Sequence, residues 1–120
     1  MTEPRDSHKT YEVDFSEGAL IQLRAIRRYI YGATLSLTTA QRYTDRIAAQ
    51  CRSLRRFPHR HKNRYDLVEG MHVFGYDRRV AITYLIDDDA LKVSITGVFY
   101  GGQDWESQLE PEDTSFDENE

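Results

Sequence analysis

The chain has 120 residues and a mass of 14.1 kDa, which corresponds to a single domain. Apolar residues make up 39% and charged residues 30% of the sequence, which allows a modest core but excludes a multidomain enzyme or a deep cofactor cleft. Cys51 is the only cysteine, so an internal disulfide and a cysteine-based zinc site are excluded. No apolar run approaches the roughly 20 residues of a membrane span, and the polar N-terminus is no signal peptide. We therefore expect a cytoplasmic protein.

The formal net charge of -4 conceals an uneven distribution of charge along the chain. Residues 19–64 carry eleven basic side chains and one acid, Asp45, whereas residues 103–120 carry eight acids and no base. Most of the basic residues are arginines, which favour bidentate pairing with carboxylates or phosphates. The basic stretch predicts either a solvated helical face or a surface for an anionic partner, which would be an acidic protein segment or nucleic acid.

Residues 11–15 alternate between apolar and acidic side chains, which predicts a short strand with one buried face. Ser16 follows as the N-cap of a helix. Apolar residues from Leu20 to Ile30 recur at helical spacing and form its buried stripe, and Gly32 is expected to end it.

A second, longer helix follows after a short linker. Thr38 and Gln41 have the three-residue spacing of a capping box. The apolar stripe continues through Cys51 and Leu54, and Pro58 is expected to stop the helix. Two adjacent amphipathic helices predict an antiparallel helical hairpin. Because Cys51 lies on the apolar stripe, its thiol is expected to be buried and inert.

The second half of the chain predicts a small antiparallel sheet. The expected strands cover residues 65–68, 71–76, 80–86 and 91–98, and the last one continues toward Tyr100. Residues 80–86 are largely apolar on both faces, which is typical of a central strand covered on both sides. The acidic residues 87–89 form a turn, and Gly101 and Gly102 end the last strand.

The histidines and the known sequence motifs give little support for cofactor or metal chemistry. His59 and His61 lie in a basic, solvent-facing loop and lack a carboxylate or thiolate at ligand spacing, so no metal site is expected. No glycine-rich phosphate cradle is present, so no nucleotide cofactor is expected. His72 falls within a predicted strand, where a neutral, hydrogen-bonded histidine is the expected outcome and catalysis the alternative.

The composition changes again near the C-terminus. Trp105 and Leu109 are expected to dock one short helical turn, whereas the acidic stretch beyond Glu110 has only Phe116 as a large apolar residue. Such a segment cannot bury enough apolar surface to offset its ordering entropy. We expect a flexible segment at residues 1–10, one domain at residues 11–110 and a disordered acidic tail at residues 111–120.

The order of these elements resembles the ParE/RelE superfamily of toxins from type II toxin–antitoxin systems, and its ParE branch most closely. The resemblance rests on residues 11–16 leading into the first helix, on Tyr29 and Ile30, on the pair Gly70 and Met71, and on residues 100–106. It covers residues 11–109. It implies an α+β fold of order β-α-α-β-β-β, in which the helical hairpin packs on a small, mainly antiparallel sheet.

The superfamily holds two functions, and the resemblance implies different residues for each. RelE-like members cleave ribosome-bound mRNA with Lys and Arg groups and often a Tyr or His on the sheet. At the matching positions after the final strand this chain has Gly101, Gly102 and Gln103, which carry no positive charge to stabilise a phosphoryl transition state. A nuclease would have to use the remaining acid, base and cationic groups, which are His72, Tyr76, Arg78 and Arg79.

The ParE-like reading implies a toxin without catalytic residues that binds and poisons DNA gyrase. The target-binding residues expected in the family's C-terminal region are Tyr100, Asp104 and Trp105. The basic residues that are common in ParE members at the end of the final strand are absent here, which leaves a non-toxic interaction module with the same fold as a further alternative.

The resemblance also implies a cognate antitoxin. It would be a ParD-like ribbon-helix-helix protein whose amphipathic segment wraps the hairpin and the sheet. The antitoxin-binding residues expected on the exposed side of the long helix are Arg42, Arg46 and Arg56. No cofactor, no metal, no membrane contact and no direct sequence-specific binding to nucleic acid are expected.

Overall fold

The computed structural model describes residues 9–101, which form an α+β fold in the expected order of elements. The strands are β1 (Glu12–Phe15), β2 (Lys62–Asn63), β3 (Met71–Tyr76), β4 (Val80–Asp87) and β5 (Lys92–Tyr100). The helices are α1 (Glu17–Thr34) and α2 (Leu37–Arg52), and two short 3-10 turns, η1 (Ser53–Arg55) and η2 (Pro58–Arg60), follow α2. Within these residues, neither helix combines the length and the apolar character that a bilayer span requires.

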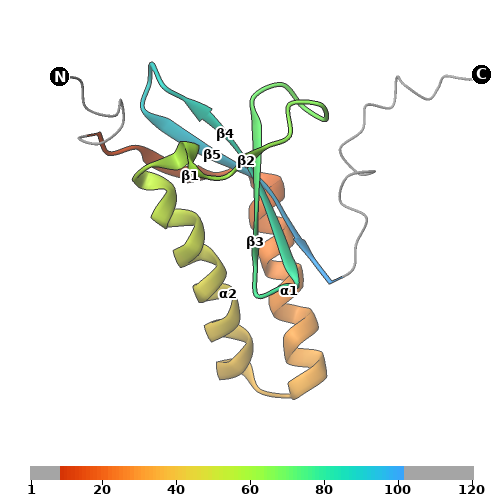
Figure 1. Ribbon diagram of the computed structural model, residues 1–120. Helices are drawn as coiled ribbons and strands as arrows, with labels where there is room; N and C mark the ends of the chain where they lie inside the picture. Colours follow the sequence, from red (N-terminus) through yellow and green to blue (C-terminus); the bar gives the residue numbers. More distant parts are fainter. Residues whose placement is uncertain (1–8, 102–120) are drawn as a thin grey trace, which may run out of the picture.

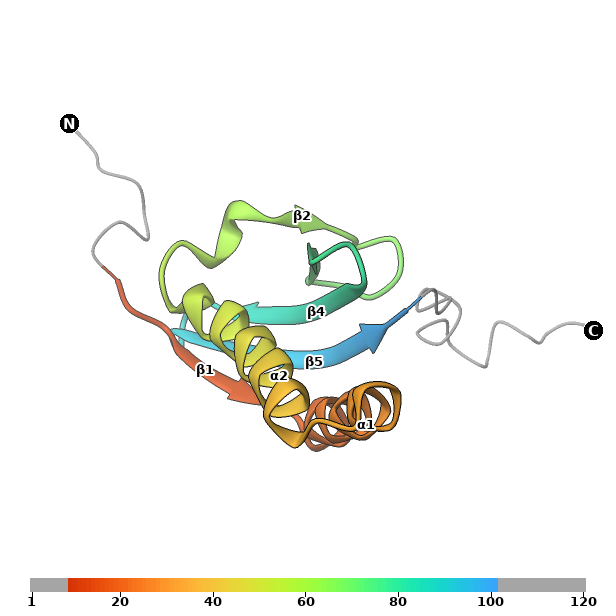
Figure 2. The ribbon, with the colours of Figure 1, turned by 90° about the horizontal axis from the view of Figure 1, so that it is seen from below.

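The five strands form one sheet in the order β1-β5-β4-β3-β2. Its neighbours are antiparallel except at one edge, where β1 runs parallel to β5 from the pair Glu12 and Lys92 to the pair Phe15 and Ile95. Both helices lie on the same face of the sheet as an antiparallel hairpin (Figures 1 and 2). The predicted helical hairpin on a mainly antiparallel sheet is therefore confirmed.

The core lies between the hairpin and the sheet. Fully buried side chains come from α2 (Ile47 and Cys51), from η1 (Leu54) and from β4 (Ile82 and Tyr84). β4 occupies the middle of the sheet, so the predicted central position is confirmed. The expected cover on both sides is only partial, because on the face away from the helices Thr83 is buried whereas Ala81 and Leu85 are half-buried. Burial raises the pKa of the Cys51 thiol to about 12, which keeps it protonated and inert near neutral pH.

The first helix starts where the sequence predicts and ends later. Ser16 caps it, with its hydroxyl accepting a hydrogen bond of 3.0 Å from the Ala19 amide. The expectation that Gly32 ends the helix was wrong, because the helix continues to Thr34. The chain turns at Leu35, which adopts a left-handed conformation (φ 56°) and donates its amide to the Tyr31 carbonyl at 2.7 Å.

The second helix differs from its prediction at both ends. Ser36, rather than Thr38, is the N-cap, and its hydroxyl accepts from the Thr39 amide at 3.1 Å. The side chain of Gln41 therefore takes no part in a capping box. The helix ends at Arg52, ahead of the 3-10 turn η1, so Pro58 does not stop it and instead opens η2.

The strand expected at residues 65–68 was wrong. Those residues form turns held by the Arg64 carbonyl, which accepts from the Leu67 and Val68 amides at 3.0 and 3.3 Å. The strand lies earlier, at Lys62–Asn63, and pairs with β3. An antiparallel return from β2 to β3 needs a reversal of the chain, and residues 64–70 supply it, ending at Gly70 with φ 79°.

Candidate functional site

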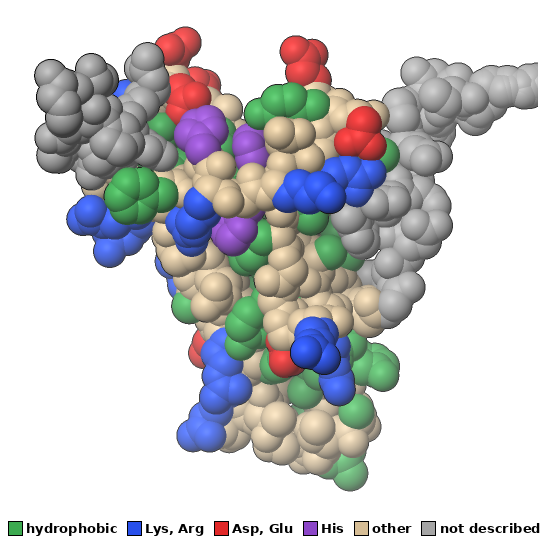
Figure 3. Space-filling model, viewed as in Figure 1, with side chains coloured by type: hydrophobic (Ala, Val, Ile, Leu, Met, Phe, Trp, Pro, Cys, Tyr) green, Lys and Arg blue, Asp and Glu red, His purple; other side chains and the backbone are tan. Residues whose placement is uncertain are grey.

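Aromatic and histidine side chains gather where β3 begins, and we call this group the histidine cluster (His59, His61, Tyr65, His72, Phe74 and Tyr84). The His72 ring stacks on Tyr84 with 5.3 Å between ring centroids, and the His61 ring stacks on Phe74 at 4.5 Å. The pairing of β2 with β3 and the short turn η2 bring these rings together. Histidine side chains are grouped on this face, with Lys and Arg side chains around them (Figure 3).

Two histidines of this cluster, the buried His72 and the half-buried His61, are neutral near pH 7. Burial, then the neighbouring His59, lowers the pKa of His72, while the Gly70 backbone and Asp88 act in the opposite direction. Burial also lowers the pKa of His61. His72 is only 4% exposed, and its Nδ1 atom has no hydrogen-bond partner within residues 9–101. The predicted neutral state fits these directions, but the expectation of a fully hydrogen-bonded ring was wrong.

One carboxylate borders the histidine cluster. The Asp88 Oδ1 atom accepts a hydrogen bond from the Tyr11 hydroxyl at 2.7 Å and lies 2.9 Å from His59 Nε2. These hydrogen bonds lower the pKa of Asp88, the one from His59 more than the one from Tyr11. Tyr11, just ahead of β1, and Asp88, in the β4–β5 turn, are thus joined to the basic loop that follows α2. His59 is therefore a partner of Asp88 rather than a purely solvated side chain.

A second group lies at the other end of β3, and we call it the tyrosine–arginine cluster (Tyr29, Tyr43, Tyr76, Asp77, Arg79 and Tyr100). The Tyr43 hydroxyl donates to Asp77 Oδ2 at 3.1 Å, and the Tyr43 ring lies 6.0 Å from that of Tyr100 and 6.3 Å from that of Tyr76. Burial and the hydrogen bond with Asp77 raise the pKa of Tyr43, so its hydroxyl remains a donor. The hydrogen bond with Tyr100 raises the pKa of Arg79, which is exposed and stays charged.

The structure divides the residues that a nuclease of this sequence would need. His72 and Tyr76 are four residues apart on β3, which corresponds to about 13 Å along a strand. Arg78 and Arg79 lie in and after the turn beyond Tyr76. Tyr76, Arg78 and Arg79 are therefore brought together, whereas His72 belongs to the histidine cluster at the other end of the strand.

The residues expected to bind the target are placed only in part. Tyr100 is the last residue of β5, and its ring lies 5.5 Å from that of Tyr29 on α1. Asp104 and Trp105 lie outside the described residues, as do the acidic tail and residues 1–8 of the segment expected to be flexible at 1–10. Sequence reasoning missed Tyr29 and Tyr43 as neighbours of Tyr100. Both tyrosines lie on the sides of α1 and α2 that face the sheet, and the helical period of the sequence could have indicated this.

The residues expected to bind an antitoxin are all exposed. Arg42 and Arg46 lie on α2, whereas Arg56 follows η1 and so lies beyond the long helix rather than on it. Arg42 also lines a groove at the end of the hairpin, which sequence reasoning missed. We call this groove the hairpin tip groove (Arg27, Arg28, Tyr31, Leu37, Thr38, Gln41 and Arg42).

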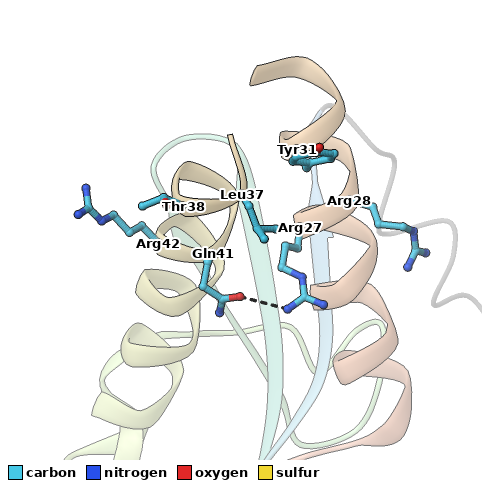
Figure 4. Close-up of a pocket in the computed structure, with 7 residues that line it drawn as sticks. All are labelled: Arg27, Arg28, Tyr31, Leu37, Thr38, Gln41 and Arg42. Carbon is cyan, nitrogen blue, oxygen red and sulfur yellow. Dashed lines mark hydrogen bonds between the residues drawn. The ribbon is translucent and has the colours of Figure 1, made fainter. Parts of the chain in front are cut away.

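Inside the groove the two helices are joined by a hydrogen bond of 3.1 Å from the Arg27 guanidinium to Gln41 Oε1 (Figure 4). Arg28 and Arg42 extend from the opposite sides of the hairpin. The groove can therefore accept an anionic chain with an apolar side chain, because arginines border it and Leu37 and Tyr31 line it. No group of three His, Cys, Asp or Glu side chains within residues 9–101 could hold a metal ion.

The fold and these surfaces define a small α+β domain with a basic helical hairpin on one face of a mixed sheet. Residues 13–105 match the family model described as the ParE toxin of the type II toxin–antitoxin system parDE. The chain therefore belongs to the ParE toxin family, within the ParE/RelE superfamily. A search of curated proteins gives no significant match.

Two solved structures share the fold. A chain of the chromosomal ParDE system from P. aeruginosa aligns with a TM-score of 0.64 and 15% identity, covering 77% of this chain and 97% of that one. A chain of the RelBE2 toxin–antitoxin complex from Mycobacterium tuberculosis aligns with a TM-score of 0.54 and 22% identity, covering 82% of this chain and 99% of that one. The predicted α+β fold is thus confirmed.

Proposed function

We propose that this toxin is ParE-like in action: it binds and poisons DNA gyrase in the cytoplasm without a catalytic step of its own. The observation that carries the proposal is the separation of His72 from Tyr76, Arg78 and Arg79 by about 13 Å of β3. A general acid and base must both reach the same phosphoryl centre within hydrogen-bond distance. His72 and Tyr76, the acid and base of this set, lie about 13 Å apart along β3, which does not favour their acting on one phosphoryl centre.

The target surface in this proposal centres on Tyr100 and continues into Asp104 and Trp105. Tyr29, Tyr43 and Arg79 surround Tyr100, and tyrosine and arginine are among the residue types that dominate interface energies. A surface of this composition fits protein binding without chemistry.

The antitoxin in this proposal is a ParD-like ribbon-helix-helix protein that covers the basic hairpin. Its acidic residues would pair with Arg42, Arg46 and Arg56, which are exposed and have no ion-pair partner within residues 9–101. Arg42→Glu with Arg46→Glu is expected to weaken antitoxin binding at low salt, and the loss should shrink as salt screens the charges. The matched control is Arg52→Glu with Arg55→Glu. If Arg42→Glu with Arg46→Glu leaves the affinity for the antitoxin unchanged, the hairpin is only a solvated surface.

The proposal is tested by induced expression without antitoxin, with DNA breaks and mRNA cleavage followed in the same cells. We expect DNA breaks, abolished by Trp105→Ala and retained in Tyr76→Phe and His72→Phe. A thermal melt of each variant comes first, because Trp105 is also a candidate core residue. DNA breaks that persist in a folded Trp105→Ala variant would contradict the assigned target surface.

The second candidate is an mRNA endonuclease, and one observation favours it. The segment from His61 to Tyr65 carries two rings of the histidine cluster and the cations Lys62 and Arg64, and this mixture of cations and rings suits single-stranded RNA, although Arg64 is paired with Asp66 at 2.9 Å. If this surface were the active site, expression would cleave mRNA, and His72→Phe would remove that cleavage without loss of folding. If expression causes neither DNA breaks nor mRNA cleavage and growth is not inhibited, the non-toxic interaction module is favoured.

A further inference from the structure

The hairpin tip groove is an open cavity of about 660 Å³ at the end of α1 and the start of α2 (Figure 4). Two large apolar side chains in it remain in contact with solvent, Tyr31 at 46% exposed and Leu37 at 64%. The adjoining Leu35 is 79% exposed. This is an apolar surface that the rest of the described chain does not cover.

The groove also carries positive charge that the described residues do not neutralise. Arg28 and Arg42 have no hydrogen-bond or ion-pair partner within residues 9–101, and Arg27 donates to the neutral Gln41. The one acid of residues 19–64, Asp45, accepts from Gln41 at 2.9 Å rather than from an arginine. The tip therefore presents an uncompensated positive potential next to exposed apolar surface.

The same chain contains a segment with the complementary character. Residues 104–120 carry eight acids and no base. Phe116 lies among them, with Asp113 before it and Asp117 and Glu118 directly after it. An aromatic side chain flanked by carboxylates matches an apolar groove bordered by arginines.

The tether between the two is long enough and begins nearby. Gly101 lines a groove together with Tyr29 of α1, and the Tyr29 and Tyr100 rings lie 5.5 Å apart. From Tyr29 to the end of α1 is about 8 Å at 1.5 Å per residue. The fifteen residues that follow Gly101, ending at Phe116, have a root-mean-square span of roughly 20 Å as a flexible chain. The basic end of α2 near Arg55 lies farther from Gly101 along the hairpin, so the tether favours the tip.

We propose that the acidic segment 104–120 docks in cis on the hairpin tip groove, with Phe116 against Leu37 and Tyr31 and its carboxylates facing Arg28 and Arg42. A short tether gives an effective concentration in the millimolar range, so a weak, salt-sensitive contact is populated without any partner. The contact is transient and charge-driven, so it does not require the segment to fold. It does not depend on which molecule the toxin attacks.

The test places a nitroxide label on the tail of the full-length chain through Ser115→Cys. Cys51 is buried and its thiol protonated, so the label attaches at residue 115. We expect the amide signals of residues 27–42 to broaden at about 50 mM salt, with those of residues 52–64 unaffected, although both stretches are basic. At about 0.5 M salt the broadening should fall more than twofold because the Debye length shrinks severalfold.

Two variants keep the proposal falsifiable. Arg28→Gln with Arg42→Gln should halve the broadening or more, whereas Arg55→Gln with Arg56→Gln removes the same charge at the other end of α2 and should leave it unchanged. The docking site would be overturned if both double variants lost the same amount of broadening. It would also be overturned if the broadening were spread evenly over all the basic residues. In a mixture of labelled and unlabelled chains, broadening that arises only from contacts between different molecules would overturn the cis contact. It would favour docking on a second copy instead.

Discussion

The two ends of β3 carry aromatic clusters of opposite character. At the histidine cluster, His72 and Tyr84 are buried and stacked, the histidine is neutral with its Nδ1 atom unpaired, and the Tyr84 hydroxyl donates to the Pro58 carbonyl at 2.6 Å. At the tyrosine–arginine cluster, Tyr43 and Arg79 are hydrogen-bonded, at least partly exposed, and next to charges. The comparison indicates that one end holds the sheet to the segment after α2, while the other remains partly exposed to solvent.

The largest expected effect is on stability at the histidine end. Tyr84→Ala should lower the free energy of unfolding by about 3–5 kcal/mol, because it removes a fully buried ring and also leaves the Pro58 carbonyl without its 2.6 Å hydrogen bond. Tyr76→Ala, at the other end, should cost at most about 2 kcal/mol because Tyr76 is only half-buried. Urea unfolding of both variants measures the difference. Equal losses in the free energy of unfolding would show that the two ends of β3 contribute equally to stability.

The next effect is on the pH dependence of stability. His61 and His72 have folded-state pKa values below their ordinary value. The unfolded chain therefore binds more protons as the pH falls below about 6.5, so the free energy of unfolding should decrease as the pH is lowered through this range. His72→Phe should weaken this pH dependence, because the phenyl ring has no nitrogen to protonate. The same ring keeps the stacking on Tyr84, so the fold is retained.

The control for this prediction comes from the other end of the strand. Tyr76→Phe leaves both histidines in place, so its unfolding midpoints in urea at pH 7.5, 6.5 and 5.5 should follow those of the unaltered chain. If His72→Phe shows the full pH dependence, then the burial of His72 does not control its protonation.

The smallest expected effect is at the turn of the tyrosine–arginine cluster. Asp77 and Arg78 both have left-handed backbone conformations, with φ of 56° and 58°. These two residues are the centre of a β-turn closed by the Arg79 amide on the Tyr76 carbonyl at 3.2 Å, within a three-residue loop. Such a turn favours glycine at its second central position, so Arg78→Gly should raise the free energy of unfolding by about 0.5–1 kcal/mol. If Arg78 also contacts the target, the variant will be more stable and less toxic. A loss of stability would show that the Arg78 side chain holds the turn.

The sequence predicts most of this fold because its patterns are local. The apolar stripes of α1 and α2 and the alternation in β4 and β5 each lie within one element, and the buried residues Ile26, Ile47 and Ile95 follow them. The helix ends were less predictable because Gly32 was compatible with two outcomes. The hydrogen bond from the Leu35 amide to the Tyr31 carbonyl selects the longer helix.

The candidate sites were less predictable because they are assembled from distant residues. His59 meets Asp88 across 29 positions and Tyr43 meets Asp77 across 34, and no spacing rule links such pairs. The strand at Lys62–Asn63 was not predicted, because two polar residues show no apolar alternation. This strand nevertheless places the His61 ring against Phe74 of the sheet. Exposure of Arg42 and Arg46 was predictable because the helical period alone determines it.

The parallel pairing of β1 with β5 also has a consequence for the order of folding. Val13 pairs with Val93, eighty positions later, so the first strand to be made waits for the last one before it can join the sheet. Long-range pairing of this kind slows folding, whereas the helical hairpin needs only neighbouring residues. During synthesis the hairpin can therefore form while the sheet is still incomplete. Newly made chains should pass through a stage in which the basic helices are present before the surface around Tyr100 exists.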